Sequence, residues 1–159
     1  MRHMILSVLA CTLATSCGPN AAAFQPDTII AMERAALDRW GHGDPGGYLE
    51  IYAPEVTYFD PFTEKRVDSL EAMQKYLAPF KGKVKVDRFD MMDPKVQHHG
   101  DAAVLSFNLV SYGKTSGGGE TALARWNASK VYSRIDGQWK IVHEHWSFIK
   151  PEIKQPSKE

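Results

Sequence analysis

Residues 122–148 have the sequence ALARWNASKVYSRIDGQWKIVHEHWSF. Apolar and polar side chains alternate on both sides of Asp136-Gly137, a residue pair typical of a tight hairpin turn. Successive side chains of a strand point to opposite faces, so the alternation predicts two long strands, Ala122–Arg134 and Gln138–Phe148. The short turn between them makes the pair antiparallel.

The same alternation extends towards the N-terminus. It predicts three further strands, at Val84–Met91, Lys95–His98 and Ala102–Tyr112. Gly100-Asp101 is a turn signal, and Thr115–Glu120 is a longer, glycine-rich hairpin loop. Residues 84–148 therefore predict a meander of antiparallel strands.

Three helices are predicted before this meander. The first is capped by Asp27, the second follows Asp44-Pro45, and the third begins with a capping box of Asp68 and Glu71. A short strand, Val56–Asp60, lies between the second and the third helix. This order is typical of an α+β domain in which three helices pack on one face of a curved antiparallel sheet.

The composition indicates one soluble globular domain. The chain has 159 residues, and its 19 Lys and Arg balance its 19 Asp and Glu. The length suits a single domain with its own core. The charge balance removes the broad basic surface that sequence-independent nucleic-acid binding requires, so no nucleic-acid partner is expected. Two cysteines cannot form a disulfide framework.

The N-terminus is typical of an export signal. Arg2 and His3 precede an apolar run over residues 4–14, which is too short for a membrane-spanning helix but suits a signal peptide. Ala14-Thr15-Ser16-Cys17 resembles a bacterial lipobox, although leucine stands one place earlier than usual. Cleavage after Ala21-Ala22-Ala23 is the alternative.

These signals predict the organisation of the chain. A signal peptide over 1–16 is followed by lipidated Cys17 as the mature N-terminus, a tether over 17–26, the domain over 27–151 and a polar tail over 152–159. The expected location is the bacterial cell envelope as a lipoprotein, or the periplasm in the alternative. With an almost neutral mature chain, membrane attachment is expected only through the lipid.

Three strings of residues resemble a known family. Residues 51–61 (IYAPEVTYFDP), 99–101 (HGD) and 134–145 (RIDGQWKIVHEH) look like the nuclear-transport-factor-2-like superfamily, which includes SnoaL-like cyclases and ketosteroid isomerases. The nearest likeness is to the association domain of calcium/calmodulin-dependent protein kinase II. The resemblance covers about residues 29–151 and implies a cone-shaped fold, in which helices close one end of a bent sheet around a pocket. It says little about activity, because this superfamily hosts many functions.

The isomerase resemblance makes Asp60 the candidate catalytic base. In the isomerases, the aspartate of this Asp-Pro pair moves a proton next to a carbonyl, and a carboxylate at the end of an apolar strand suits such work. The donors that would hold the developing oxyanion are missing, because the matching positions are Ala36 and residues 128–130, which include no acid. The alternative is that Asp60 caps the turn that follows it.

The association-domain resemblance supplies candidate ligand-binding residues. Three arginines point into the pocket of that domain, and their counterparts here are Asn108, Lys130 and Trp146. Only Lys130 keeps a charge, so a mixed polar and aromatic lining is expected in place of a carboxylate site. The other candidates on this wall are Tyr58, Trp126, Tyr132 and Glu144. The alternative is that the large aromatic residues belong to the core.

The histidines are weaker candidates. His143 and His145 are spaced so that both point the same way on a strand, as a metal pair requires. A zinc or copper site needs a third ligand, which the sequence does not offer at an obvious spacing, so neither a metal nor another cofactor is expected. His98 and His99 are interpreted as the solvated end of a hairpin.

The alternation also predicts a dimer. Trp139, Ile141 and the pair His143 and His145 are expected on one face of the last strand. Leu105, Phe107 and Leu109 of the strand Ala102–Tyr112 are expected on the same face of the sheet. We expect this to be the convex face and to pack against a second copy, because the sheet has apolar residues on both faces and helices on only one.

Two functional hypotheses follow. The first is an exported module that binds an unknown small molecule or forms a homodimer, without catalysis. The second is a small-molecule isomerase, dehydratase or cyclase with Asp60 as its base and Tyr58, Lys130 or Trp146 orienting the substrate. The missing oxyanion donors favour the first.

Overall fold

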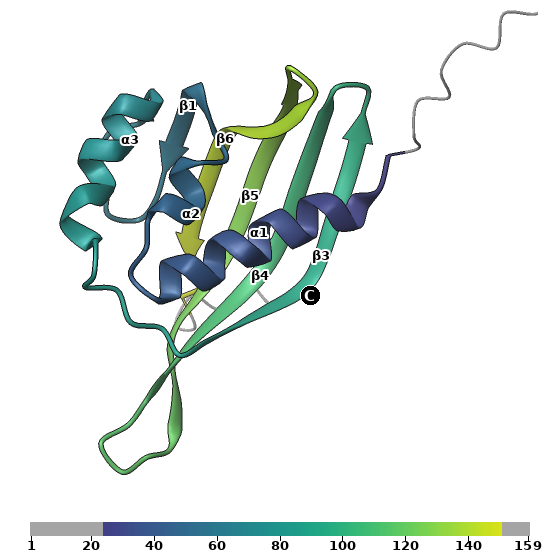
Figure 1. The fold of residues 1–159 in the computed structure, drawn as a ribbon. Helices are drawn as coiled ribbons and strands as arrows, with labels where there is room; N and C mark the ends of the chain where they lie inside the picture. Colours follow the sequence, from purple (N-terminus) through teal and green to yellow (C-terminus); the bar gives the residue numbers. More distant parts are fainter. Residues whose placement is uncertain (1–23, 151–159) are drawn as a thin grey trace, which may run out of the picture.

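The computed structural model describes residues 24–150, and Figure 1 shows its fold. The N-terminal half contains α1 (Pro26–Gly41), α2 (Gly46–Leu49), β1 (Tyr52–Phe59), β2 (Val67–Asp68), α3 (Leu70–Leu77) and the 3₁₀ turn η1 (Ala78–Phe80). The C-terminal half contains β3 (Arg88–His99), β4 (Ala102–Lys114), β5 (Glu120–Ile135) and β6 (Gln138–Phe148). The predicted signal peptide, Cys17, most of the tether and the predicted polar tail over 152–159 lie outside the described residues.

The six strands form one curved sheet in the order β2-β1-β6-β5-β4-β3. Neighbouring strands are antiparallel except for β1 and β6, which are parallel. In Figure 1, α1 crosses one face of this sheet, and α3 lies beside β1. The structure thus confirms the predicted α+β fold, with one parallel pair in an otherwise antiparallel sheet.

The predicted hairpin of β5 and β6 forms around Asp136 and Gly137, which both have positive φ values, of 50° and 79°. Positive φ at both central residues is what a tight hairpin turn of this kind requires. The register of the pair shifts between Val131 and Tyr132, so that Val131 pairs with His143 but Tyr132 pairs with Ile141. This irregularity is a β-bulge, and it switches the direction of side chains along β6.

The bulge corrects the predicted faces of β6. Ile141 is fully buried in the core, and Glu144 is 1% exposed on the same side of the sheet, although their numbers differ in parity. His143 and His145 point to the other face, where neither is buried. The prediction that Ile141 shares a face with the histidine pair is therefore wrong.

The core lies between the sheet and the helices. Leu105, Phe107 and Leu109 of β4 are buried there, with at most 5% of their surface exposed. They were expected on the convex face and instead cover the inner face. Burying them beneath α1 removes their apolar surface from water.

Some element boundaries also differ from the predictions. The cap of α3 is Ser69, whose hydroxyl accepts from the Ala72 amide at 3.2 Å, whereas Asp68 pairs with Arg66. The second helix is a single turn, and Tyr52 already begins β1. The two short strands predicted within residues 84–98 form one strand, β3. None of the helices within residues 24–150 combines the length and hydrophobicity needed to cross a membrane.

Candidate functional site

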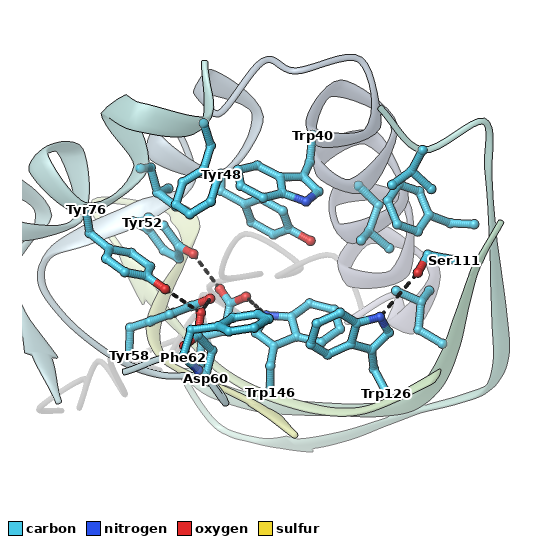
Figure 2. A pocket seen from close by; sticks show the side chains of 17 residues that line it. Trp40, Tyr48, Tyr52, Tyr58, Asp60, Phe62, Tyr76, Ser111, Trp126 and Trp146 are labelled. Carbon is cyan, nitrogen blue, oxygen red and sulfur yellow. Dashed lines mark hydrogen bonds between the residues drawn. The ribbon is translucent and has the colours of Figure 1, made fainter. Parts of the chain in front are cut away.

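A cavity of about 160 Å³ lies between the inner face of the sheet and the helices. Ten of its 17 lining residues are Phe, Tyr or Trp, and Figure 2 shows how they surround the space. The three remaining polar residues of the lining are Asp60, Ser111 and Glu144. Apolar cavities with a few placed polar groups are the usual form of a small-molecule site.

Two tryptophans from neighbouring strands form the floor of the cavity. Trp126 of β5 and Trp146 of β6 meet edge to face, with ring centroids 5.9 Å apart. The Trp146 indole donates to Glu144, and the Trp126 indole donates to the Ser111 hydroxyl at 3.4 Å. These bonds fix the orientation of both rings.

A buried cluster of charges lies behind this floor. Lys130 Nζ is 2.6 Å from Glu144 Oε1 and 3.0 Å from Glu33 Oε1, and all three side chains are at most 1% exposed. The Lys130 ammonium also lies 4.4 Å from the centre of the Trp146 ring. The cluster joins α1, β5 and β6, so it couples the helix layer to the sheet.

Three tyrosines complete the hydrogen bonds of the two glutamates. Tyr48 and Tyr132 donate to the two oxygens of Glu33 at 2.8 and 3.1 Å, and Tyr52 donates to Glu144 Oε2 at 2.7 Å. Burial raises the pKa of Glu33, against the opposing effect of Lys130. Burial also raises the pKa of each of the three phenols well above its usual value, and the neighbouring carboxylates add to this. The hydroxyls therefore remain protonated donors.

Glu33 was not predicted from the sequence as a site residue. A signal was present, because Glu33 is four residues after Ile29 and four before Leu37, both of which belong to the apolar stripe of α1. An acid on such a stripe is buried with its helix face and needs partners there.

Asp60 lies at the rim of the cavity, directly after β1. Its Oδ2 accepts from the hydroxyls of Tyr58 and Tyr76 at 3.0 and 2.6 Å, and its Oδ1 accepts from the Phe62 amide at 2.8 Å. Figure 2 shows Tyr58 and Tyr76 meeting at this carboxylate. Burial and the contact with Asp60 raise the pKa of the Tyr76 phenol. Asp60 thus caps a turn and faces the cavity at once.

The structure brings most of the predicted site residues together. Tyr58, Trp126, Glu144 and Trp146 line the cavity with Asp60. Lys130 and Tyr132 are fully buried and do not line it. Lys130 contacts the lining residues Glu144 and Trp146, whereas Tyr132 donates to Glu33.

Asn108 does not belong to this group. It lies on the opposite face of the sheet, beside its cross-strand partner Asn127, and its amide donates to the Asn127 side chain at 2.7 Å. Its predicted place in the pocket is therefore corrected. Ala36 is buried in α1 and supplies no donor.

The histidines lie outside the cavity. His143 Nδ1 is 2.8 Å from the Thr57 hydroxyl, and its partial burial lowers its pKa. Within residues 24–150, no group of three His, Cys, Asp or Glu side chains has the arrangement to hold a metal ion. His98 stacks on Phe24 with ring centroids 3.8 Å apart, so this end of the predicted tether contacts the domain.

Comparison with known protein families identifies the family to which this chain belongs. A family model of the calcium/calmodulin-dependent protein kinase II association domain matches residues 25–149. The chain belongs to this association-domain family. This confirms the resemblance that residues 51–61, 99–101 and 134–145 carry. No curated protein matches the chain.

Solved structures share this fold. A "putative ketosteroid isomerase" from Parabacteroides distasonis is 36% identical, with a TM-score of 0.70, over 84% of this chain and 95% of that one. The association domain of the C. elegans kinase is 24% identical, with a TM-score of 0.65, over 76% and 93%. The S. rosetta kinase hub is 21% identical, with a TM-score of 0.63, over 81% and 100%. The last two likenesses concern the fold alone.

Proposed function

We propose that this member of the association-domain family binds a small, ring-bearing organic molecule in the aromatic cavity and does not convert it. Family membership supports a ligand-binding or dimerisation module. The observation that carries the finer proposal is the occupation of Asp60, which already accepts from two hydroxyls and one amide. A general base needs an open acceptor position facing the substrate proton, and three donors leave Asp60 little room for that.

An isomerase is the second candidate. It is favoured by the 36% identity to the Parabacteroides distasonis protein and by the position of Asp60 in the cavity lining. Against it stands Ala36, which offers no donor for a developing oxyanion.

Native mass spectrometry of the purified protein tests the proposal. We expect a bound small molecule that dissociates under denaturing conditions and is reduced in Trp126→Ala, because that change removes half of the cavity floor. Leu123→Ala, on the exposed part of β5, is the control and should retain the adduct. The second measurement adds a β,γ-unsaturated ketosteroid and follows formation of the conjugated enone. Turnover that is lost in Asp60→Asn would replace the binding proposal by the isomerase.

We also propose that the protein forms a homo-oligomer through the outer face of the sheet. The similar structures include two that are called kinase hubs, and the term "hub" denotes the centre of an assembly. On this face Phe59 is 36% exposed and its ring lies near those of His143 and His145, with centroids 6.4 and 6.1 Å away. An exposed aromatic residue between partly apolar neighbours is typical of an interface.

Light scattering of Phe59→Asp tests the interface. We expect the wild-type protein to be at least a dimer at micromolar concentration, and the variant to be a monomer, because a buried unpaired carboxylate opposes association. Leu123→Asp places the same charge at another exposed apolar position and should remain oligomeric. A monomeric wild-type protein contradicts the proposal.

Export with a lipid on Cys17 remains a proposal that rests on the sequence alone. The intact mass of the mature protein, made with its own N-terminus in a bacterium, decides between the two processing sites. Lipidated Cys17 as the first residue supports the anchor, whereas an unmodified chain beginning at Phe24 supports a periplasmic form.

A further inference from the structure

The hydroxyl groups at the rim of the cavity already donate hydrogen bonds to protein acceptors. Tyr58 and Tyr76 both donate to Asp60 Oδ2. A tyrosine hydroxyl has one proton and two lone pairs, so a hydroxyl that donates its proton to a carboxylate presents only lone pairs to a ligand. At the rim, the cavity therefore offers acceptors.

The side-chain donors deeper in the cavity also donate to protein acceptors. The Tyr52 hydroxyl and the Trp146 indole both donate to Glu144, and the Trp126 indole donates to Ser111. Ser111 in turn donates to the Ala124 carbonyl at 3.4 Å. Among the described lining residues with a side-chain donor, the indole of Trp40 is the one for which no protein acceptor is found. One neutral indole N–H does not bind a carboxylate, which needs several donors or a cation.

The charge of the lining has the same sign throughout. It contains Asp60 and Glu144, and within the described part of the chain it contains neither Lys nor Arg. Lys130 lies behind the floor between Glu33 and Glu144, so its charge is already balanced by the protein. The cluster is neutral when Glu33 holds a proton and negative when it does not. In neither state does it attract an anion.

The aromatic walls complete this arrangement. The faces of aromatic rings attract cations, and an enclosed ammonium gains more from them than an exposed one. Lys130 already illustrates the contact, because its ammonium lies over the rings of Tyr48 and Trp146 at 4.7 and 4.4 Å. Tyr48 and Trp146 also line the cavity.

We propose that the cavity selects a small organic ammonium, that is, a protonated amine on a flat apolar body, and rejects carboxylates of the same shape. The apolar body would lie on Trp126 and Trp146, and the ammonium would donate to the lone pairs of Tyr58 and Tyr76, with the negative charge of Asp60 directly behind these two hydroxyls. The inference rests on the proposed binding function and specifies its ligand class. It also reverses the charge preference that the association-domain resemblance implies for a pocket with three arginines.

Calorimetric titration with three matched probes at pH 7 tests this selection. The probes are 2-phenylethylamine, 2-phenylethanol and phenylacetate, which share a ring and differ in charge. We expect the amine to bind at least about tenfold more tightly than the alcohol, since a charged hydrogen bond is worth more than a neutral one, and phenylacetate to bind most weakly.

Two variants assign the preference to the cavity. Asp60→Asn keeps the size of the side chain and removes its charge, so the advantage of the amine over the alcohol should fall by about tenfold. Glu64→Gln removes a charge from an exposed residue of the same loop and should leave the advantage unchanged. Trp126→Ala should weaken all three probes, because it removes their common contact.

The outcomes separate the two proposals. If phenylacetate or the alcohol binds as tightly as the amine, the ammonium assignment is wrong and the binding function stands. If Glu64→Gln weakens the amine as much as Asp60→Asn does, the preference is a general surface effect and the assignment fails too. If none of the three probes binds, the binding function itself is contradicted.

Discussion

Lys130→Met is expected to lower the free energy of unfolding by about 3–5 kcal/mol, the usual cost of removing one partner from a buried ion pair. The side chain is fully buried and contacts both Glu33 and Glu144. Methionine fills a similar volume but leaves two buried carboxylates without a cation. Chemical denaturation followed by tryptophan fluorescence measures the loss.

Two further variants show that charge, and not packing, is responsible. In Lys130→Met combined with Glu33→Gln and Glu144→Gln, no unpaired charge remains, so most of the stability should return. Lys75→Met breaks an exposed ion pair with Glu71 and should leave stability nearly unchanged. A triple variant no more stable than Lys130→Met would show that packing around the lysine stem dominates.

The second expected result is an unusual pH dependence that originates at Glu33. Burial raises its pKa in the folded chain above the ordinary value of 4.5. Below the ordinary pKa both the folded and the unfolded chain hold the proton. Above it the unfolded chain releases the proton first, so the stability of the folded state falls as the pH rises towards the raised pKa. The slope is at most about 1.4 kcal/mol per pH unit for one proton.

Glu33→Gln cannot titrate and isolates this contribution. We expect the difference in unfolding free energy, wild type minus Glu33→Gln, to decrease with rising pH above about 4.5. Glu50 provides the control of opposite sign, because its hydrogen bond to Arg39 lowers its pKa. For wild type minus Glu50→Gln, the difference should instead increase as the pH rises through the lowered pKa. A wild-type minus Glu33→Gln difference that rises with pH would mean that Lys130 dominates over burial.

The sequence predicts the sheet well because alternation is a local signal. Gln138–Phe148 is found with the predicted bounds, and the turn at Asp136-Gly137 forms as expected. Alternation shows which residues share a face of a strand, but it does not show which face the helices cover. For that reason Leu105, Phe107 and Leu109 were correctly grouped together and assigned to the wrong side.

The position of Asn108 depends on register, which is not a local property. Asn108 lies opposite Asn127, and Asn127 is next to Trp126, whose side chain faces the cavity. Two residues directly opposite each other in neighbouring strands point to the same face, so both asparagines point away from the cavity. The glycine-rich loop between the strands leaves their register open in the sequence.

The bulge in β6 could not be predicted from the sequence for a related reason. Nothing in the residues between Ile141 and His143 indicates the irregularity, which arises from the pairing with β5. The ion cluster shows the opposite case. Glu33 could be found from its place on an apolar helix stripe, but its partners Lys130 and Tyr132 come from β5, about a hundred residues later.

The parallel pairing of β1 with β6 has a consequence for the order of folding. Thr57 pairs with His143, so the two sides of the cavity come from opposite ends of the chain. Contacts between residues so far apart in sequence close large loops and form slowly. During synthesis, the cavity and its ion cluster cannot form before the last strand has left the ribosome. A growing chain of this topology therefore stays incompletely folded until β6 has been made.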